Sequence, residues 1–395
     1  MTTRYVITDS VPLNGGDEAL LRTLIGAIMT RDSTASITVL AKDVERCRLQ
    51  CPDLTFDCDP AFFNASPQDD NAHQRISALF QSAEIIISSP GGFLNDYYRI
   101  DGRLQSLELA IESGTPVVLF GQSIGPIWKE ESKTALARTL NRCRAICVRD
   151  DQSIECLHEC GVDSDRIHRT TDVAFLLHHR TPQRSLGRNP GAPTRSIGMC
   201  FRRWPLHDHA MHDQIALNAA QLAAQLLDAD TDRHITFLST CQGIEGYKDD
   251  SEFAEHIVGQ LSAAQRERCT IDSQRHNPQE LITRFGRFDA LIGMRLHACI
   301  LAMLGGCPAL GVGYEFKTRG IFTDLNLDDF QFDYDQPLDH WLQQAEQFLC
   351  RIEEIRLALP AALNDASARV ERSLIHVQPN PDAQSTSTDS NLELA

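Results

Sequence analysis

Short apolar runs recur along this 395-residue chain, each followed by a turn and then by a stretch with helical periodicity. The clearest case lies between residues 290 and 312. There, Ala290–Ile292 and Ala309–Val312 are typical of buried strands, and Leu296–Leu304 between them is typical of a helix. A strand, a helix and a second strand in this order are typical of parallel pairing. Repetition of this unit predicts an α/β fold with doubly wound parallel sheets.

The alternation of strand and helix patterns divides the chain into two such units. In the first unit, apolar runs predict strands at Tyr5–Thr8, Ile37–Leu40, Ile85–Ser88, Val117–Phe120 and Ala145–Val148. In the second unit, Ile197–Phe201 and Ile235–Leu238 are the corresponding runs ahead of residue 290. A chain of this length, 42% hydrophobic and 23% charged, can bury two cores.

The segment 178–195 is rich in Arg, Pro and Gly and has no apolar period, which indicates a linker. A single helix is expected at Trp341–Leu359, and the Pro, Ser, Thr, Asp and Asn bias of the last residues predicts a disordered tail. The expected organisation is therefore an N-terminal Rossmann-like domain at 1–177, a linker at 178–195, a C-terminal Rossmann-like domain at 196–340, a helical segment bracing the domains at 341–375 and a tail at 376–395.

An arginine and a histidine lie at the turn that begins the helix near residue 296. Backbone N–H groups and the helix dipole favour an anion at such a turn. Arg295 is suited to grip a phosphate or a carboxylate with two parallel hydrogen bonds, and His297 can supply a proton near neutral pH. The alternative is a buried arginine and a core histidine that only cap the helix.

Further polar residues follow the predicted strands, where open α/β sheets bind their ligands. After Ile197–Phe201 come Arg202 and Arg203, of which only one is expected to enter the site because neighbours on a strand point to opposite faces. Tyr314 and Lys317 follow Ala309–Val312, and Lys317 is suited to bind phosphate as a point charge. In the first unit, the candidates for hydrogen bonds to sugar hydroxyls are Asn14, Gly16, Asp17, Asn95, Asp96, Gln122 and Ser123.

Each of these residues also has a structural alternative. Asp17 can cap the helix that follows it, and Gln122 and Ser123 can serve loop architecture ahead of a Gly-Pro turn. Arg149 is interpreted as an ion-pair residue at the domain junction. His178 and His179 flank the linker and are expected at the surface.

Charge and composition exclude several classes of protein. A net charge of −17 argues against a general nucleic-acid or anionic-membrane surface, so a phosphorylated substrate needs a local basic pocket. No apolar run reaches roughly 18 residues and no signal segment begins the chain, which predicts a cytoplasmic protein. The 13 cysteines lack CxxC pairs with matching histidines, so no metal is expected. The glycine-containing loop at 14–21 lacks the dinucleotide and P-loop patterns.

Several motifs in order resemble those of the polysaccharide pyruvyl transferase family. They are NGGDEALL (14–21), PGGFLND (90–96), FGQSIGPI (120–127), VRDDQSIECL (148–157), TDVAFLL (171–177) and the Arg-Leu-His segment at 295–297. The resemblance extends from about the first strand to residue 329. The chain departs from the family pattern at Pro90, where a glycine is more usual, and at Asp150 and Asp151, where an Arg-Glu pair is.

The resemblance implies a GT-B-like fold, with the two parallel sheets facing a cleft, and the transfer of pyruvate from phosphoenolpyruvate to a sugar as a ketal. Arg202 matches the family's arginine at the strand end. By this resemblance Arg202, Arg295 and Lys317, with Tyr314, would bind the donor, and His297 would protonate its methylene carbon, with no cofactor beyond the co-substrate.

Two other functions stay open at this point. One is a GT-B glycosyltransferase that uses a nucleotide sugar, and the other is a non-catalytic binding subunit. The partners expected are a small-molecule donor and a sugar or glycan-precursor acceptor, with no nucleic acid. A lipid-linked acceptor would bring the protein to the inner face of the membrane. Oligomeric state is not readable from these patterns.

Overall fold

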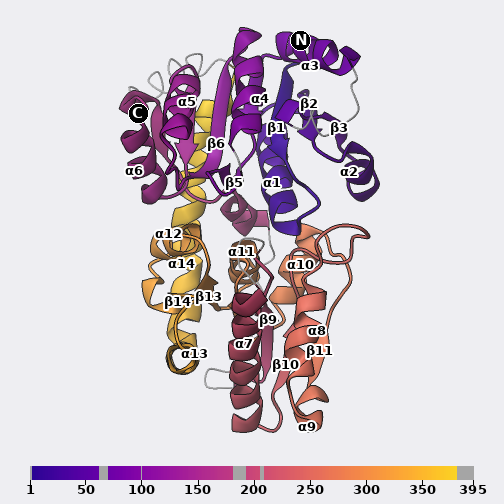
Figure 1. The fold of residues 1–395 in the computed structure, drawn as a ribbon, viewed down its shortest axis with the longest axis vertical. Coiled ribbons are helices and arrows are strands. Elements are labelled where there is room, and N and C mark those ends of the chain that lie inside the picture. Colours follow the sequence, from indigo (N-terminus) through magenta and orange to yellow (C-terminus); the bar gives the residue numbers. More distant parts are fainter. Residues whose placement is uncertain (1, 62–69, 99, 181–192, 205–208, 380–395) are drawn as a thin grey trace, which may run out of the picture. The chain divides into compact units, whose positions relative to one another are not determined.

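The computed structural model describes residues 2–61, 70–98, 100–180, 193–204 and 209–379, which group into two compact units (Figure 1). Unit 1 contains Met1–Val11, Leu20–Val173 and Ala368–Ala395, and unit 2 contains Pro12–Ala19 and Ala174–Ser367. Among the described residues, none of the helices has the length and apolarity that a membrane span needs.

Unit 1 is built on an eight-stranded sheet with the order β3-β2-β1-β4-β6-β7-β8, and β5 also pairs with β6. All pairings are parallel. The strands are β1 (Arg4–Ser10), β2 (Ser36–Ala41), β3 (Thr55–Cys58), β4 (Ile85–Ser88), β5 (Gly91–Leu94), β6 (Val117–Ile124), β7 (Ala145–Val148) and β8 (Ile167–Arg169). Strands β4, β6 and β7 are buried along their whole length, as expected when both faces of a parallel sheet are covered.

The helices α1 (Gly15–Arg31), α2 (Val44–Gln50), α3 (Asp70–Ser82), α4 (Asp101–Glu112), α5 (Glu130–Leu140) and α6 (Asp151–Cys160) connect these strands, with a short 3-10 turn at η2 (Ser164–Arg166). Helix α6 shows why such helices begin and end where they do. The Asp150 carboxylate accepts the Ser153 N–H at its start, and Gly161, with φ 86°, ends it in the left-handed conformation.

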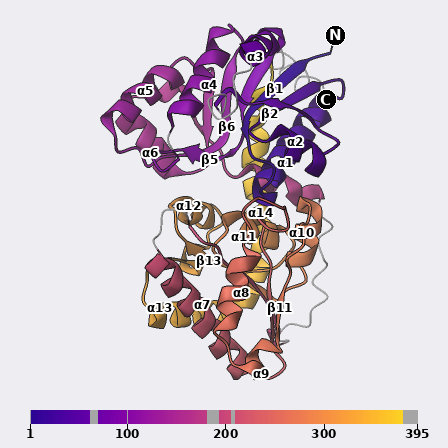
Figure 2. The ribbon, with the colours of Figure 1, turned by 45° about the vertical axis from the view of Figure 1, so that its right-hand side comes forward.

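Unit 2 is built on a six-stranded parallel sheet with the order β11-β10-β9-β12-β13-β14. The strands are β9 (Ser196–Cys200), β10 (His234–Phe237), β11 (Cys269–Ile271), β12 (Ala290–Gly293), β13 (Ala309–Gly313) and β14 (Gln331–Asp333). The helices are α7 (His209–Ala229), α8 (Ser251–Gly259), α9 (Ala263–Arg266), α10 (Pro278–Phe285), α11 (Leu296–Leu304), α12 (Lys317–Asp324), α13 (Leu338–Cys350) and α14 (Ile352–Ser373), with 3-10 turns at η3 (Val173–Arg180) and η4 (Asp328–Phe330). Helix α14 continues into unit 1 at Ala368, and the 3-10 turn η5 (Leu374–Val377) belongs to unit 1. Helix α7 packs on β10, α8 on β11, and α11 on β12 and β13 (Figure 2).

Every strand predicted from an apolar run is present, and β4 and β7 have the predicted bounds. The prediction missed β3, β5, β8, β11 and β14. These strands have only three or four residues and most are partly exposed, so their hydrophobic signal is weak. The prediction of a single helix at Trp341–Leu359 was also wrong. Arg351 separates α13 from α14, and α14 continues through Pro360.

Two segments group with a different unit than the predicted domain boundaries imply. Residues 12–19 belong to unit 2, where the Gly15 N–H donates to the Thr240 carbonyl oxygen at 2.7 Å and Glu18 pairs with Arg275 at 2.7 Å. Residues 368–379 belong to unit 1. The predicted tail from residue 376 was wrong at its start, because η5 continues to Val377; residues 380–395 lie outside the described chain, as does 181–192 of the predicted linker.

Of the two histidines that follow the motif at 171–177, one is exposed and one is buried. His179 is exposed as predicted, but His178 is 3% exposed, so the prediction for His178 was wrong. Burial lowers the pKa of His178, and the neighbouring His179 adds to that effect. The ring therefore favours its neutral form.

Candidate functional site

The loops after β9 and β12 of unit 2 lie at the point where the strand order reverses. Strand β9 pairs with β10 on one side and with β12 on the other, so the chain leaves β9 and β12 in opposite directions. Open α/β sheets bind ligands in the crevice that this divergence leaves at the carboxyl ends of the strands. Arg202 follows β9 and Arg295 follows β12, so both predicted arginines come from these two loops.

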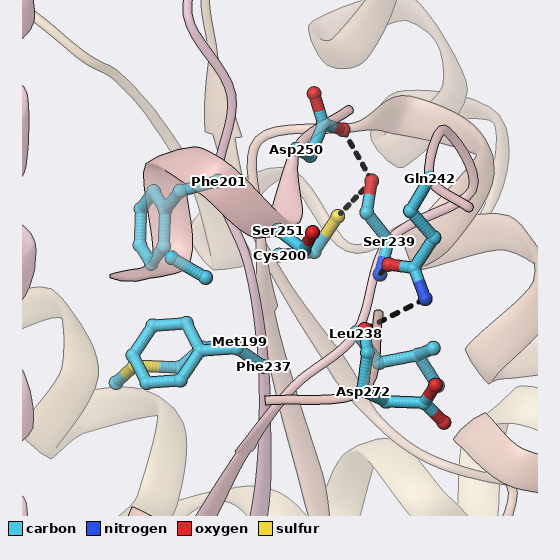
Figure 3. Close-up of a pocket in the computed structure, with 11 residues that line it drawn as sticks. Met199, Cys200, Phe201, Phe237, Leu238, Ser239, Gln242, Asp250, Ser251 and Asp272 are labelled. Carbon is cyan, nitrogen blue, oxygen red and sulfur yellow. Dashed lines mark hydrogen bonds between the residues drawn. The ribbon is translucent and has the colours of Figure 1, made fainter. Parts of the chain in front are cut away.

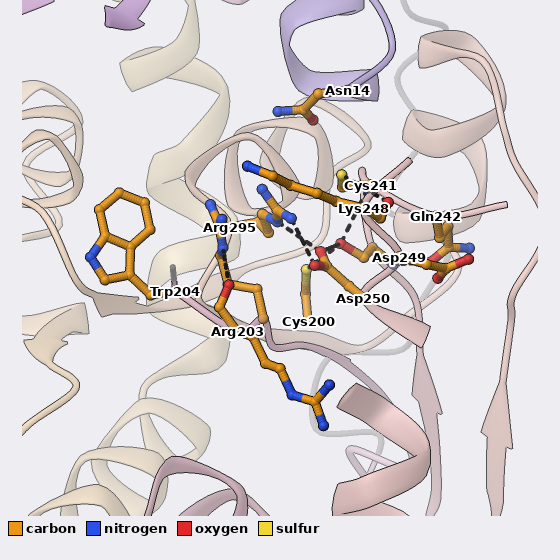
Figure 4. Close-up of polar contacts among 12 residues, drawn as sticks. Asn14, Cys200, Arg203, Trp204, Cys241, Gln242, Lys248, Asp249, Asp250 and Arg295 are labelled. Carbon is orange, nitrogen blue, oxygen red and sulfur yellow. Dashed lines mark hydrogen bonds and ion pairs between the residues drawn. The ribbon is translucent and has the colours of Figure 1, made fainter. Parts of the chain in front are cut away.

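Arg295 is held by a buried ion pair with Asp250. Its Nε and Nη2 each donate to one Asp250 oxygen at 2.7 Å, and both residues are 6% exposed (Figure 4). Burial alone would lower the pKa of Arg295, but the Asp250 carboxylate outweighs burial and raises it further. Because a guanidinium has five N–H groups, this fork leaves the two on Nη1 and one on Nη2 for a ligand.

Asp250 is itself held by hydrogen bonds from residues that line a narrow pocket next to it. The Ser239 hydroxyl donates to Asp250, and the Cys200 thiol donates to the Ser239 hydroxyl at 3.5 Å (Figure 3). Gln242 accepts the Ser239 N–H at 2.7 Å and donates to the Asp272 carbonyl oxygen at 2.7 Å. Sequence reasoning missed Asp250, because it lies 45 residues before Arg295 on another loop.

Arg202 lies in an aromatic setting, 5% exposed. Its Nη1 donates to the Tyr314 hydroxyl at 3.1 Å, and its guanidinium carbon lies 5.0 Å from the Trp204 ring centroid and 5.2 Å from that of Tyr314. Arg203 turns instead to Phe253, 5.6 Å from its ring centroid. The two arginines therefore separate, and it is Arg202 that lies with Tyr314.

Lys248, on the loop between β10 and α8, adds a cation that the sequence patterns did not indicate. Burial lowers its pKa, and the positive charges of Arg202 and Arg295 lower it further. Figure 4 shows its side chain extending past the Arg295 guanidinium, on the side of the ion pair where Asn14 lies. Lys317, by contrast, pairs with Glu315 at 2.5 Å and lies 5.8 Å from the Tyr314 ring centroid.

The first turn of α1 contacts the His297 end of α11. A Cβ added to Gly16 would lie 2.6 Å from both Cβ and Nδ1 of His297, so only glycine allows this approach. Asn14 accepts the Gly16 N–H at 3.1 Å and donates to the Asp17 carboxylate at 3.0 Å. Asn14, rather than Asp17, therefore caps α1, and of these three predicted acceptor residues it is Gly16 that lies against His297.

Two other predicted acceptor residues, in unit 1, are occupied by the protein itself. Asp96 accepts the N–H groups of Trp128 and Lys129 at 2.8 and 3.0 Å and the Ser132 hydroxyl at 2.6 Å. Partial burial would raise the pKa of Asp96, but these hydrogen bonds lower it below its usual range. Asn95 accepts the Tyr98 N–H at 3.1 Å. Both residues therefore shape the loop after β5.

Gln122 and Ser123 lie within β6, not in the loop predicted for them. Gly121, with φ 65°, produces a shift in register between Phe120 and Gln122. Gln122 donates to the Ser88 hydroxyl at 2.7 Å. The Ser123 hydroxyl donates to Asp150 at 2.5 Å and accepts from Arg149, which itself pairs with Asp172 at 2.6 Å. Arg149 is thus an ion-pair residue, as predicted.

A buried carboxyl pair lies at the carboxyl end of β1, which the sequence analysis did not single out. Asp9 and Asp59 are 2% and 0% exposed, and the Asp9 N–H donates to Asp59 at 2.7 Å. Arg103 pairs with Asp9 at 2.8 Å and lies 3.8 Å from Asp59. Burial and the Asp9 charge raise the pKa of Asp59 to about 6. Asp9 has φ 65°, an uncommon conformation for a residue with a side chain.

Two parallel-sheet units of this kind define the GT-B-like class of fold, and solved structures of that class match nearly the whole chain. MnaA from Staphylococcus aureus with UDP has a TM-score of 0.62, 11% identity and coverage of 95% of this chain and 96% of its own. HepE from Anabaena with UDP-glucose has a TM-score of 0.60, 13% identity and coverage of 98% and 99%. At this identity the likeness concerns the fold alone.

Sequence comparison then identifies the family. The model of the polysaccharide pyruvyl transferase family matches residues 44–315, so the chain belongs to that family. The amylovoran biosynthesis protein AmsJ of Erwinia amylovora is 26% identical over 277 residues, which cover 67% of this chain. The match spans 65% of AmsJ, slightly less than two thirds of its length.

Proposed function

We propose that this protein transfers pyruvate from phosphoenolpyruvate to two hydroxyls of a sugar in polysaccharide biosynthesis. The observation that carries the proposal is the group of cations at the strand ends of unit 2, where Lys248 extends past the Arg295 guanidinium and the charges of Arg202 and Arg295 both act on Lys248. Asp250 already neutralises Arg295, so Arg202 and Lys248 supply the positive charge left for an anion, which the net charge of −17 would otherwise disfavour. Phosphoenolpyruvate carries both a phosphate and a carboxylate.

In the proposed reaction, Arg202 and the free N–H groups of Arg295 bind the phosphate and carboxylate, with Lys248 and Lys317 as further charges. His297, as an imidazolium, gives a proton to the methylene carbon, and C2 becomes electrophilic. A sugar hydroxyl forms a bond to C2 and loses its proton to a base, for which Asp17 in the first turn of α1 is the candidate. Phosphate leaves with the proton that Asp17 took up, as a second hydroxyl bonds to C2, closes the ketal and gives its proton to the now neutral His297.

The decisive assay is phosphate release from phosphoenolpyruvate together with a candidate sugar acceptor. His297→Ala should lower turnover roughly 100-fold, the usual contribution of a general acid, while donor binding measured by calorimetry stays. His256→Ala is the matched control, because that histidine is 42% exposed on α8 and lies outside the site. A folded His297→Ala protein with wild-type turnover would exclude His297 as the acid.

Calorimetry also distinguishes phosphoenolpyruvate from a nucleotide sugar as the donor. The solved structures with this fold include complexes with UDP and UDP-glucose. Phosphoenolpyruvate binding that weakens in Lys248→Met supports the proposal, because Lys248 contributes charge without being part of the buried ion pair. Binding of a UDP-sugar with no response to phosphoenolpyruvate would instead favour glycosyl transfer, the alternative that the fold allows.

A further inference from the structure

Three exposed aromatic residues gather on two loops of unit 1. Tyr97, Tyr98 and Trp128 are 41%, 43% and 50% exposed. Tyr97 and Trp128 pack edge to face, with ring centroids 4.9 Å apart at 68°. The other large hydrophobic side chains of the described chain with comparable exposure are aliphatic and lie on separate helices, namely Met29, Leu49, Leu217 and Leu357. The aromatic group is therefore a local feature and not a general property of the surface.

The two loops are built to present these rings. One follows β5 and the other follows β6, and because β5 and β6 are parallel neighbours, both loops leave from the carboxyl edge of the sheet. The Asp96 carboxylate joins the loops by accepting the N–H groups of Trp128 and Lys129 at 2.8 and 3.0 Å. The Asp96 N–H donates to the Pro126 carbonyl oxygen at 3.1 Å, a second link. The carboxyl edge is where open sheets bind ligands.

From this arrangement we propose that Tyr97, Tyr98 and Trp128 form a carbohydrate platform that binds the acceptor glycan of the proposed reaction. Sugars present a face of C–H groups that packs on the electron-rich face of an aromatic ring, while their hydroxyls stay in water. Tyr and Trp provide a large rigid contact area with few torsions to freeze, which suits a weakly held saccharide. This inference rests on the proposed function, since it assigns the acceptor side of that reaction.

The charges around the platform favour a neutral sugar over an anionic membrane. Asp101, Glu130 and Glu131 are exposed in the first turns of α4 and α5, and Lys129 is the exposed cation among the described residues there. Arg103 and Lys133 of the same turns are partly buried and pair with Asp9 and Glu130. An anionic lipid surface recruits clusters of exposed Lys and Arg, which the described residues of these turns do not form. A membrane thus becomes an outcome that the experiment must exclude.

Tryptophan emission offers a direct measurement on the intact protein. The chain has three tryptophans, of which Trp204 and Trp341 are 4% and 0% exposed, so Trp128 dominates the response to an added surface ligand. The probes are the methyl glycosides of galactose and mannose and β-linked oligosaccharides of each. We expect a saturable emission shift for at least one probe. Calorimetry should show that the affinity for this saccharide is retained in Trp128→Phe and weakened about tenfold or more in Trp128→Ala and Tyr97→Ala.

The controls separate this inference from the proposed function. Leu357→Ala, at a position 72% exposed on α14, should leave saccharide binding unchanged. Phosphoenolpyruvate affinity of Trp128→Ala should stay within twofold of wild type, because the donor residues belong to unit 2. If phosphoenolpyruvate binds but no saccharide does, or if Trp128→Ala binds saccharide as wild type does, the platform is refuted and the function stands. Trp128-dependent binding to phosphatidylglycerol vesicles without saccharide binding would also refute it.

Discussion

At the residue scale, the site depends on Arg295, which is buried in an ion pair but keeps N–H groups that can bind a ligand. Removing two charges from water costs several kcal/mol per ion, and the Arg295–Asp250 pair offsets this cost through the attraction of its charges, its two 2.7 Å hydrogen bonds and the Ser239 hydroxyl that donates to Asp250. The planar fork orients Nη1, so a bound anion meets a donor that is already fixed. A lysine at this position would keep the charge but lose the orientation.

Gly16 gives the sharpest prediction at this scale. In Gly16→Ala, the new Cβ would meet the His297 side chain at 2.6 Å, so the first turn of α1 or the imidazole must move. We expect turnover to fall at least tenfold, in view of how strongly a misplaced catalytic group slows a reaction, with donor affinity nearly unchanged. Steady-state kinetics and calorimetry with phosphoenolpyruvate measure the two quantities.

The matched control is Gly259→Ala in α8, where an added Cβ meets no atom within 4 Å. Because alanine is the better helix former, this change should keep activity and leave stability equal or slightly higher. Loss of donor affinity in Gly16→Ala parallel to the loss of turnover would contradict the assigned effect on His297 alone.

At the element scale, strand ends collect the polar groups of both sheets. Strand β1 ends at the Asp9–Asp59 pair, and β12 ends at Arg295. Hydrogen bonds to Asp59 come from the Asp9 and Ala61 N–H groups and the Ser106 hydroxyl, and Arg103 adds a positive charge. This environment satisfies the carboxyl group without fully compensating its burial, which is why its pKa is raised.

The raised pKa of Asp59 predicts the direction in which its contribution to the free energy of unfolding changes with pH. An unfolded Asp titrates near 3.8 and this one near 6, so between these values the folded state binds more protons than the unfolded state. The contribution of Asp59 to the free energy of unfolding is therefore greatest below the lower value and falls as pH rises through the higher one. Across the window the loss is about 3 kcal/mol at most, at roughly 1.4 kcal/mol per pKa unit.

Urea unfolding of wild type and Asp59→Asn at several pH values between 4.5 and 7 tests this. Since asparagine does not ionise, the stability of wild type minus that of the variant should decrease as pH rises. Other carboxylates with lowered pKa, such as Asp96, act in the opposite direction but cancel in the difference. A difference that is constant with pH would show that Asp59 does not titrate in this range.

At the scale of the whole molecule, each unit is completed by distant parts of the chain. Unit 2 takes in residues 12–19 from near the N-terminus, and unit 1 takes in residues from 368 onward. Leu374 and Val377 are 1% and 3% exposed in unit 1, and Arg144 donates to the carbonyl oxygens of His376 and, at 2.7 Å, of Gln378. The last described turn is thus part of the unit 1 core.

Truncation after Ser373 should therefore destabilise unit 1. It removes two buried aliphatic side chains, about 4 kcal/mol of apolar burial, and leaves Arg144 without these carbonyl acceptors. Hydrogen exchange should accelerate in β6, which η5 contacts, more than in β12 of unit 2. Truncation after Pro379 is the comparison; equal exchange in the two truncated proteins would show that η5 contributes little.

The sequence by itself determined the α/β class, the buried strands and the two arginines with their histidine. These features depend on local periodicity and on polar residues directly after apolar runs, which a single sequence displays. The GT-B-like class and the family followed from ordered motifs, and both agree with the comparisons. The short strands β3, β8 and β11 were missed because three or four partly exposed residues carry little periodic signal.

Only the tertiary structure decided which residues meet. Asp250 reaches Arg295 from 45 positions away, Gly16 reaches His297 from the other end of the chain, and Lys248 joins the cations from an irregular loop. The tertiary structure also placed Gln122 inside a strand, and it directed the Asp96 carboxylate to the backbone N–H groups of a neighbouring loop. Such pairings depend on strand order and loop path, and these are set by the packing of the whole sheet rather than by local composition.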